Sequence, residues 1–127
     1  MNAPGKAPRR SIVIRRAYDE PGADDGYRVL VDRFWPRGRS KAALRLDQWT
    51  RELAPSAGLI RWFGHVQTRW PAFREHYRHE LDTPASRDRL RALLDAAGDA
   101  RITLVYGARN ETENQAVVLC EVLLEMR

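Results

Sequence analysis

The sequence predicts an α/β fold: a single small domain with a short, mostly parallel central sheet flanked by helices. Three runs of mostly aliphatic residues, at 12–14, 29–31 and 102–105, have the composition of short buried strands. Segments of helical periodicity fill the long interval between the second and third runs, and another follows the third. This order is typical of an α/β sandwich with a long helical crossover between its second and third strands.

The first two predicted strands are separated by a loop rich in turn residues. The first strand spans 11–16, with its apolar residues 12–14 expected to be buried, and the second spans 27–32. The intervening residues 18–26 include four acidic side chains, but their spacing matches no metal-binding loop. We therefore expect a solvated surface there and no metal site.

Helical segments are predicted from capping residues and from the prolines and glycines that end them. The expected segments are a short turn at 40–44 capped by Ser40, a helix at 47–53 capped by Asp47, one from Ser56 to Gly64, one at 68–81, one from Thr83 to Gly98, and a last helix at 111–126 with a capping box of Thr112 and Gln115. The third strand, 101–106, lies between the last two. The helix at 68–81 has an apolar stripe expected to face the core, and so does the last helix, which includes Cys120.

Length and charge restrict the class of protein. The 127 residues fit one domain at 11–127, preceded by a basic tail at 1–10 that we expect to be flexible. No signal peptide or long apolar segment is present, so we expect a cytoplasmic protein of bacterial type with no membrane association. Residues 1–45 contain 11 Lys and Arg against 5 Asp and Glu, whereas residues 46–127 contain 11 against 12. The excess positive charge therefore belongs to the first third of the chain.

A basic turn follows the second strand, because Pro36 cannot continue a strand and Gly38 allows the backbone to turn. If the second and third strands are parallel, this turn and the connection at 107–114 meet at one edge of the sheet, where the last helix begins. The ligand-binding residues expected at this edge are Arg33, Trp35, Arg37, Lys41, Tyr106, Arg109, Asn110 and Asn114. The leading hypothesis is a small anionic ligand, with phosphate compounds included. No cofactor motif is present.

The arginines of this turn have a second interpretation that the sequence leaves open. Arg33 and Arg37 can instead pair with Asp32, Asp47 or Glu80 and fix the crossover to the sheet. The four tryptophans are expected to be packing anchors of the core.

Histidine chemistry is weakly supported. His65 follows a helix end, where a C-terminal cap or hydrogen-bonding role is expected, with general acid or base catalysis as the alternative. His76 and His79 lie three residues apart beside Glu80, but no third metal ligand is evident.

Two other kinds of partner are compatible with the sequence. Nucleic acid is an alternative ligand for the basic tail and the central loop, although no nucleic-acid-binding motif is present. A protein-interaction module is the third alternative. No residue has the setting of an activated nucleophile, and the sequence does not decide whether the protein is an enzyme.

Five segments, in this order, carry a family resemblance: YRVLVDRFWPRGRSK, LDQWTRELAPS, LIRWFGH, TRWPAFREHYRHEL and TLVYGARNETENQAVVL. They resemble the YeaO-like branch of the uncharacterised proteins grouped as domain of unknown function 488, over residues 12–124. The resemblance implies an α/β fold and no established reaction. Other branches have cysteine in the equivalent strand and helix start, where this chain has Tyr106 and Asn114, so their thiol chemistry is not implied. Relatives commonly have aspartate at the position of Asn110, which weakens the case for acid–base catalysis.

Overall fold

The computed structural model describes residues 11–126, so the tail expected at 1–10 lies outside the described residues. One sheet contains four parallel strands in the order β1–β4–β2–β3. The strands are β1 (Ile12–Arg16), β2 (Tyr27–Leu30), β3 (Gln48–Trp49) and β4 (Ile102–Tyr106). The α/β class is confirmed, and the parallel pairing of β2 with β4 places both carboxyl ends at one edge, as predicted.

The first strand is less buried than the sequence predicts. Ile12, Val13 and Ile14 are only half-buried, because β1 is an edge strand that pairs with β4 alone. Val29 and Leu30 of β2 are fully buried, since β2 lies inside the sheet and both of its faces are covered. The prediction that β2 is a buried strand is confirmed, although it ends two residues before the expected boundary.

The helix expected at 47–53 is wrong, because this segment forms β3 and then a 3-10 helix at Arg51–Leu53. The Asp47 carboxylate does not cap a helix but accepts a hydrogen bond from the Arg28 N–H at 2.9 Å. The Asp47 N–H in turn donates to the Arg28 carbonyl at 2.8 Å, and the Thr50 N–H donates to the Leu30 carbonyl at 3.0 Å. Pairing with β2 therefore replaces the local helical hydrogen bonds.

The remaining predicted helical segments are all present, although α3 and α5 begin later than expected. They are α1 (Lys41–Leu44), α2 (Ala57–Phe63), α3 (Trp70–Leu81), α4 (Pro84–Ala97) and α5 (Gln115–Met126), with a 3-10 turn at Gln67–Arg69 before α3. Side chains of Ser40, Ser56 and Thr83 cap α1, α2 and α4, as predicted.

The last helix begins later than expected and without the expected capping box. Asn114 caps α5, since its Oδ1 accepts hydrogen bonds from the N–H groups of Ala116 (2.9 Å) and Val117 (3.2 Å). The Gln115 side chain turns away from Thr112 and donates to Asp32. A tertiary contact therefore replaces the local box.

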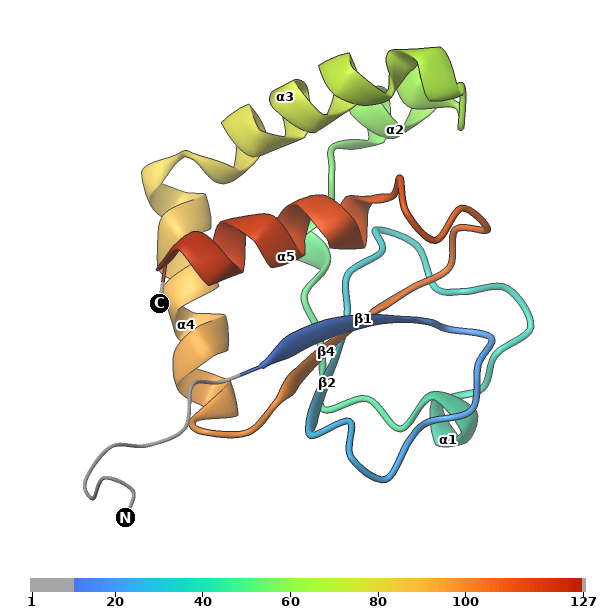
Figure 1. Cartoon of the computed structure of the whole chain (residues 1–127), viewed down its shortest axis with the longest axis vertical. Coiled ribbons are helices and arrows are strands. Elements are labelled where there is room, and N and C mark those ends of the chain that lie inside the picture. Colours follow the sequence, from blue (N-terminus) through green and yellow to red (C-terminus); the bar gives the residue numbers. More distant parts are fainter. Residues whose placement is uncertain (1–10, 127) are drawn as a thin grey trace.

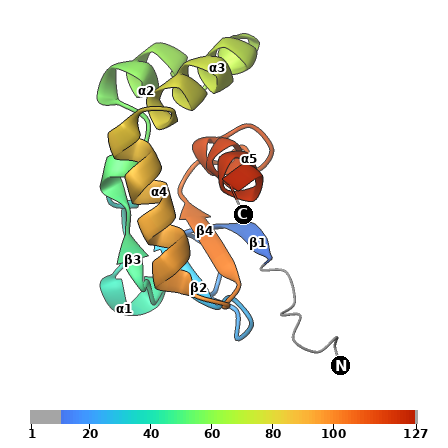
Figure 2. The same ribbon diagram turned by 90° about the vertical axis from the view of Figure 1, so that its left-hand side faces the viewer.

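The two faces of the sheet are covered differently. One face packs against α3, α4 and α5 in the main core, which includes Val29, Leu104 and Tyr77. The other face supports a smaller cluster built around Leu30 and Val105 and covered by α1 and by half-buried tryptophans. Figures 1 and 2 show α1 at the opposite end of the molecule from α2 and α3.

Asp25 and Arg28 form a buried ion pair, with 4% and 5% of the two residues exposed. The Arg28 Nε also donates to the Leu44 carbonyl at 2.9 Å. Burial raises the pKa of Asp25, but hydrogen bonds from the Gly22 N–H and from Arg28 outweigh this effect and leave it below its usual value. The pair ties the loop before β2 to the segment after it.

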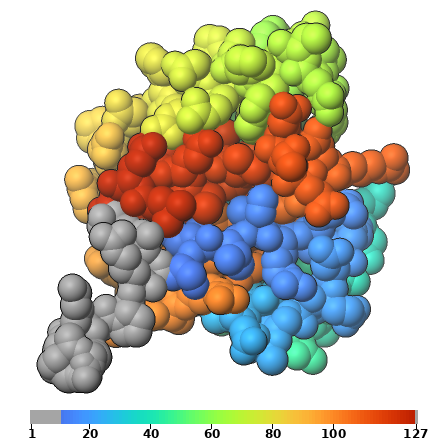
Figure 3. Space-filling model, in the orientation of Figure 1, coloured from blue at the N-terminus to red at the C-terminus, as the bar shows by residue number. Residues whose placement is uncertain are grey.

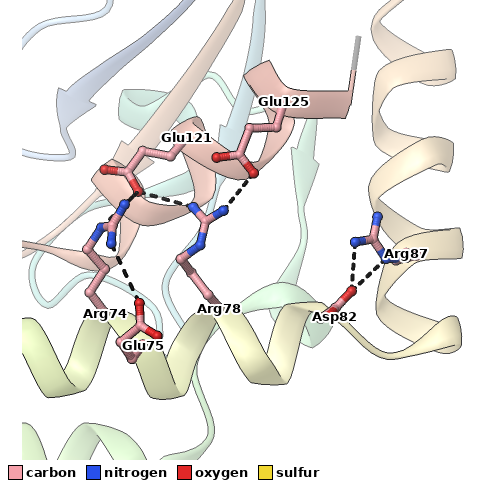
Figure 4. Close-up of polar contacts among 7 residues, drawn as sticks. All are labelled: Arg74, Glu75, Arg78, Asp82, Arg87, Glu121 and Glu125. Carbon is pink, nitrogen blue, oxygen red and sulfur yellow. Dashed lines mark hydrogen bonds and ion pairs between the residues drawn. The ribbon is translucent and has the colours of Figure 1, made fainter.

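Helix α5 runs across one face of the molecule between α3 and β1 (Figure 3). Two arginines of α3 and two glutamates of α5 join these helices (Figure 4): Arg74 contacts Glu121 at 2.8 Å, and Arg78 contacts Glu121 at 3.2 Å and Glu125 at 2.6 Å. Exposed pairs contribute little singly, but a shared network fixes the relative position of the helices. No described helix has the length and hydrophobicity that a membrane span requires.

Candidate functional site

A pocket of about 290 Å³ lies at the carboxyl ends of β2 and β4, and we call it the strand-end pocket. This is the edge at which open α/β sheets usually bind ligands. Its lining comes from the loops after β1, β2 and β4, the segment before α2, the start of α5, and aromatic residues of α2 and α3. The lining residues are Tyr18, Asp32, Arg33, Phe34, Trp35, Pro36, Pro55, Ile60, Phe63, His65, Phe73, Gly107, Ala108, Glu113, Asn114 and Gln115.

Asp32 is the principal group of this pocket that sequence reasoning did not select as a ligand. Its Oδ2 accepts a hydrogen bond from the Gly107 N–H at 2.8 Å, and its Oδ1 accepts one from the Gln115 side-chain amide. Burial raises the pKa of Asp32 from 3.8 to about 6, although both hydrogen bonds favour the ionised form. The fold therefore favours the protonated form of Asp32 more than water does. The expected alternative in which Asp32 pairs with an arginine is not what the structure contains.

Gly107 follows β4 directly and approaches this carboxylate closely. A Cβ atom at this position would lie 2.9 Å from Asp32 Oδ2. A larger residue would displace either the loop or the carboxylate, so glycine favours the hydrogen bond that holds Asp32. A glycine directly after β4 and an aspartate two residues after β2 are the sequence signal for this contact.

Arg33 combines the two roles that the sequence left open. Its Nε donates to the Pro55 carbonyl at 2.8 Å and its Nη2 to the Ala54 carbonyl at 3.4 Å, so it fixes the start of the crossover. It does so through carbonyls and not through Glu80, whose carboxylate accepts hydrogen bonds from Ser56 instead. Arg33 is also the one arginine or lysine that lines the strand-end pocket in the described chain.

Aromatic side chains form much of the wall. The Trp35 Nε1 donates to the Arg39 carbonyl at 2.6 Å, and its ring meets Trp49 edge-on at 5.5 Å. The Trp49 Nε1 donates to the Asp32 carbonyl at 2.7 Å. Phe34 projects more freely, with 59% of the residue exposed. Trp35 is thus held in place by the fold, whereas Phe34 is available to a ligand.

His65 also lines the pocket, with an unusual backbone conformation. Its φ is 60°, which is uncommon for a residue other than glycine. Gly64, and not the imidazole, ends α2, so the expected capping role is wrong. The ring lies 6.0 Å from that of Phe63, and no described group forms a hydrogen bond with it.

The other predicted site residues lie outside the pocket lining. Arg37, Lys41 and Arg109 are exposed, and the Arg37 carbonyl accepts a hydrogen bond from the Tyr18 hydroxyl at 2.9 Å. Tyr106 is buried in the main core. The Asn110 Oδ1 accepts hydrogen bonds from the N–H groups of the turn before α5. Of the eight residues predicted at this edge, the pocket contains Arg33, Trp35 and Asn114.

The remaining candidate groups do not form a metal site. His76 and His79 are exposed on α3. Over residues 11–126, no group of three or more His, Cys, Asp or Glu side chains is placed to hold a metal ion. Trp62 is 41% exposed, beneath the guanidinium of Arg69, and so is not the core anchor that the sequence predicts.

Comparison with known proteins gives one consistent result. A family model described as the inactive DUF488-N3 subclade matches residues 11–127. The uncharacterized protein YeaO of Escherichia coli K12 is 41% identical over 113 residues, which are 89% of this chain and 96% of the relative. The uncharacterized protein Rv3073c of Mycobacterium tuberculosis H37Rv is 36% identical over 112 residues, which are 88% of this chain and 92% of that protein. No solved structure matches the chain.

Proposed function

The chain belongs to the YeaO-like DUF488 family, and because its subclade is described as inactive, we propose that it binds a small anionic ligand in the strand-end pocket without converting it. The observation that carries this proposal is the convergence of aromatic rings with a few polar groups in one pocket at a sheet edge. Small-molecule sites typically combine an apolar, aromatic lining with a small number of fixed polar groups.

The polar groups constrain how an anion is oriented. Arg33 supplies positive charge, and two of its three nitrogens are already fixed by carbonyls, so little side-chain entropy is lost on binding. Asp32 and Glu113 supply negative charge in the same pocket. The anionic group of the ligand therefore faces Arg33 and His65, and the part that faces Asp32 carries hydrogen-bond donors.

This orientation predicts the pH dependence of binding. The ionised Asp32 accepts hydrogen bonds from the ligand, whereas the protonated form has one acceptor oxygen fewer. Because burial raises the pKa of Asp32 to about 6, affinity should fall as the pH drops through this value. An anion seated directly against Asp32 would show the opposite dependence.

The test measures thermal unfolding with inorganic phosphate, aminobenzoates and nucleoside monophosphates. A ligand at a hundred times its dissociation constant should stabilise the fold by about 2.7 kcal/mol. Phe34→Ala should remove most of the shift, since this exposed ring lines the pocket and supports little of the core. Arg37→Ala is the matched control, because Arg37 is exposed and outside the lining. The proposal is refuted if no compound shifts unfolding, or if Arg37→Ala abolishes a shift that Phe34→Ala leaves intact.

Nucleic-acid binding is the second candidate function, favoured by the exposed cations Arg37, Lys41 and Arg45. No ion pair joins these three to an acidic residue in the described chain. Phosphate contacts of this kind give affinity that falls steeply with salt and depends little on sequence. Oligonucleotide binding that survives Phe34→Ala and is lost in Arg37→Ala would support it.

A further inference from the structure

Asp32 and Gln115 form what we call the floor of the strand-end pocket. Their side chains have hydrogen-bond acceptor positions to which no described protein donor binds. Gln115 must donate from Nε2 to Asp32 Oδ1, because an ionised carboxylate only accepts. The Gln115 Oε1 is therefore left as an acceptor, and no described donor bonds to it. Asp32 Oδ1 and Oδ2 each receive one hydrogen bond from the protein, although a carboxylate oxygen can accept two.

These acceptors are held in fixed positions. The Gly107 N–H and the Gln115 amide orient the Asp32 carboxylate, and the start of α5 orients Gln115. A ligand whose donors match these open positions forms hydrogen bonds to an ionised carboxylate, which are stronger than those between neutral groups. The floor therefore selects a molecule that presents neighbouring donors.

We propose that the strand-end pocket recognises a guanine-type base, whose ring N–H and one exocyclic amino hydrogen donate to the Asp32 carboxylate, while the second amino hydrogen donates to the amide oxygen of Gln115. This inference rests on the proposed function and names its ligand class: guanine nucleotides. The flat ring suits the aromatic wall formed by Phe34 and Trp35, and the phosphate supplies the anion that Arg33 faces.

The same floor excludes adenine. The adenine edge places an acceptor nitrogen beside its amino group, and this lone pair would face the Asp32 carboxylate. Hypoxanthine keeps the ring N–H but lacks the exocyclic amino group. Guanosine, inosine and adenosine monophosphates (GMP, IMP and AMP) therefore form a graded series with one sugar and one phosphate in common.

Calorimetric titration of the whole chain at pH 7.5 tests the inference. A hydrogen bond to a charged group contributes about 1.5–3 kcal/mol, so GMP should bind roughly tenfold to a hundredfold more tightly than IMP, and IMP more tightly than AMP. Asp32→Asn should remove most of the preference for GMP over IMP, because the hydrogen bond to a charged group is lost. Gln115→Met, which keeps the length of the side chain, should reduce this preference. Phe34→Ala should weaken the binding of all three nucleotides by similar factors, because it changes only the aromatic wall of the pocket and not its hydrogen-bond acceptors.

The outcomes separate this inference from the proposed function. If IMP or AMP binds wild-type protein as tightly as GMP and Phe34→Ala weakens them, the guanine assignment is wrong and the pocket remains a ligand site. If no nucleotide binds but an aminobenzoate or phosphate does so through Phe34, the assignment is also wrong. If no compound binds at all, both proposals fail. The comparison of the three nucleotides on wild-type protein decides the question even if Asp32→Asn does not fold.

Discussion

Replacing Asp32 by asparagine should change how stability depends on pH. In the folded protein the pKa of Asp32 is about 6, against 3.8 for the free group, so the fold favours the protonated form. The contribution of this carboxyl to stability is therefore greatest below pH 3.8 and falls as the pH rises to about 6. At about 1.36 kcal/mol per pH unit, the total loss is about 3 kcal/mol. An asparagine side chain in its place would carry no such loss, because it stays neutral throughout.

Urea unfolding, followed by tryptophan fluorescence at a series of pH values from 3.5 to 8, measures this effect. The free energy of unfolding of Asp32→Asn relative to wild type should increase with pH by up to about 3 kcal/mol, mostly between pH 4 and 6. Asp24→Asn is the matched control, since Asp24 is exposed and its replacement should change stability little at any pH. If the difference in unfolding free energy between Asp32→Asn and wild type is independent of pH, or falls as the pH rises, the pKa of Asp32 is not raised in the folded protein.

Two further substitutions test contacts around the sheet by urea unfolding. Gly107→Ala should destabilise the fold by about 1–3 kcal/mol because its Cβ would crowd Asp32, whereas Gly58→Ala, which has open space in α2, should stabilise it by up to about 1 kcal/mol. Equal effects would contradict the crowding argument. Asp25→Ala should cost about 3–5 kcal/mol, since it leaves the Arg28 charge buried without its partner. A loss below about 1 kcal/mol would show that Arg28 reaches water.

Features decided by neighbours in sequence were predictable. The caps at Ser56 and Thr83 and the glycine stop at Gly64 depend on groups within one helical turn, so the sequence contains all that is needed. The segment at 47–53 was not predictable in this way. Its strand state comes from hydrogen bonds to β2, and a local capping pattern gives no information about that partner.

In the candidate site too, local features were predictable from the sequence and long-range contacts were not. The sequence predicted the edge at which the strand-end pocket lies, because the two buried strands and the turn after β2 are local patterns. It overestimated the charge there, since arginines adjacent in sequence need not point into the same pocket: Arg33 lines it and Arg37 does not. Asp32 stood between a buried strand and a basic turn, where it suggested an ion pair. Its actual partners, Gly107 and Gln115, are more than seventy residues away.

The pairing of β1 with β4 determines when the protein can fold during synthesis. Ile12 lies opposite Ile102, so the first strand to leave the ribosome has no partner until the last strand emerges. At roughly 5–20 residues per second, this delay is on the order of 5–18 s. Only the short β2–β3 pair can form earlier, and it lacks the central strand that carries the main core. The sheet, and with it the strand-end pocket, is therefore assembled near the end of translation, and a chain truncated before residue 102 lacks Gly107 and the start of α5, which line this pocket.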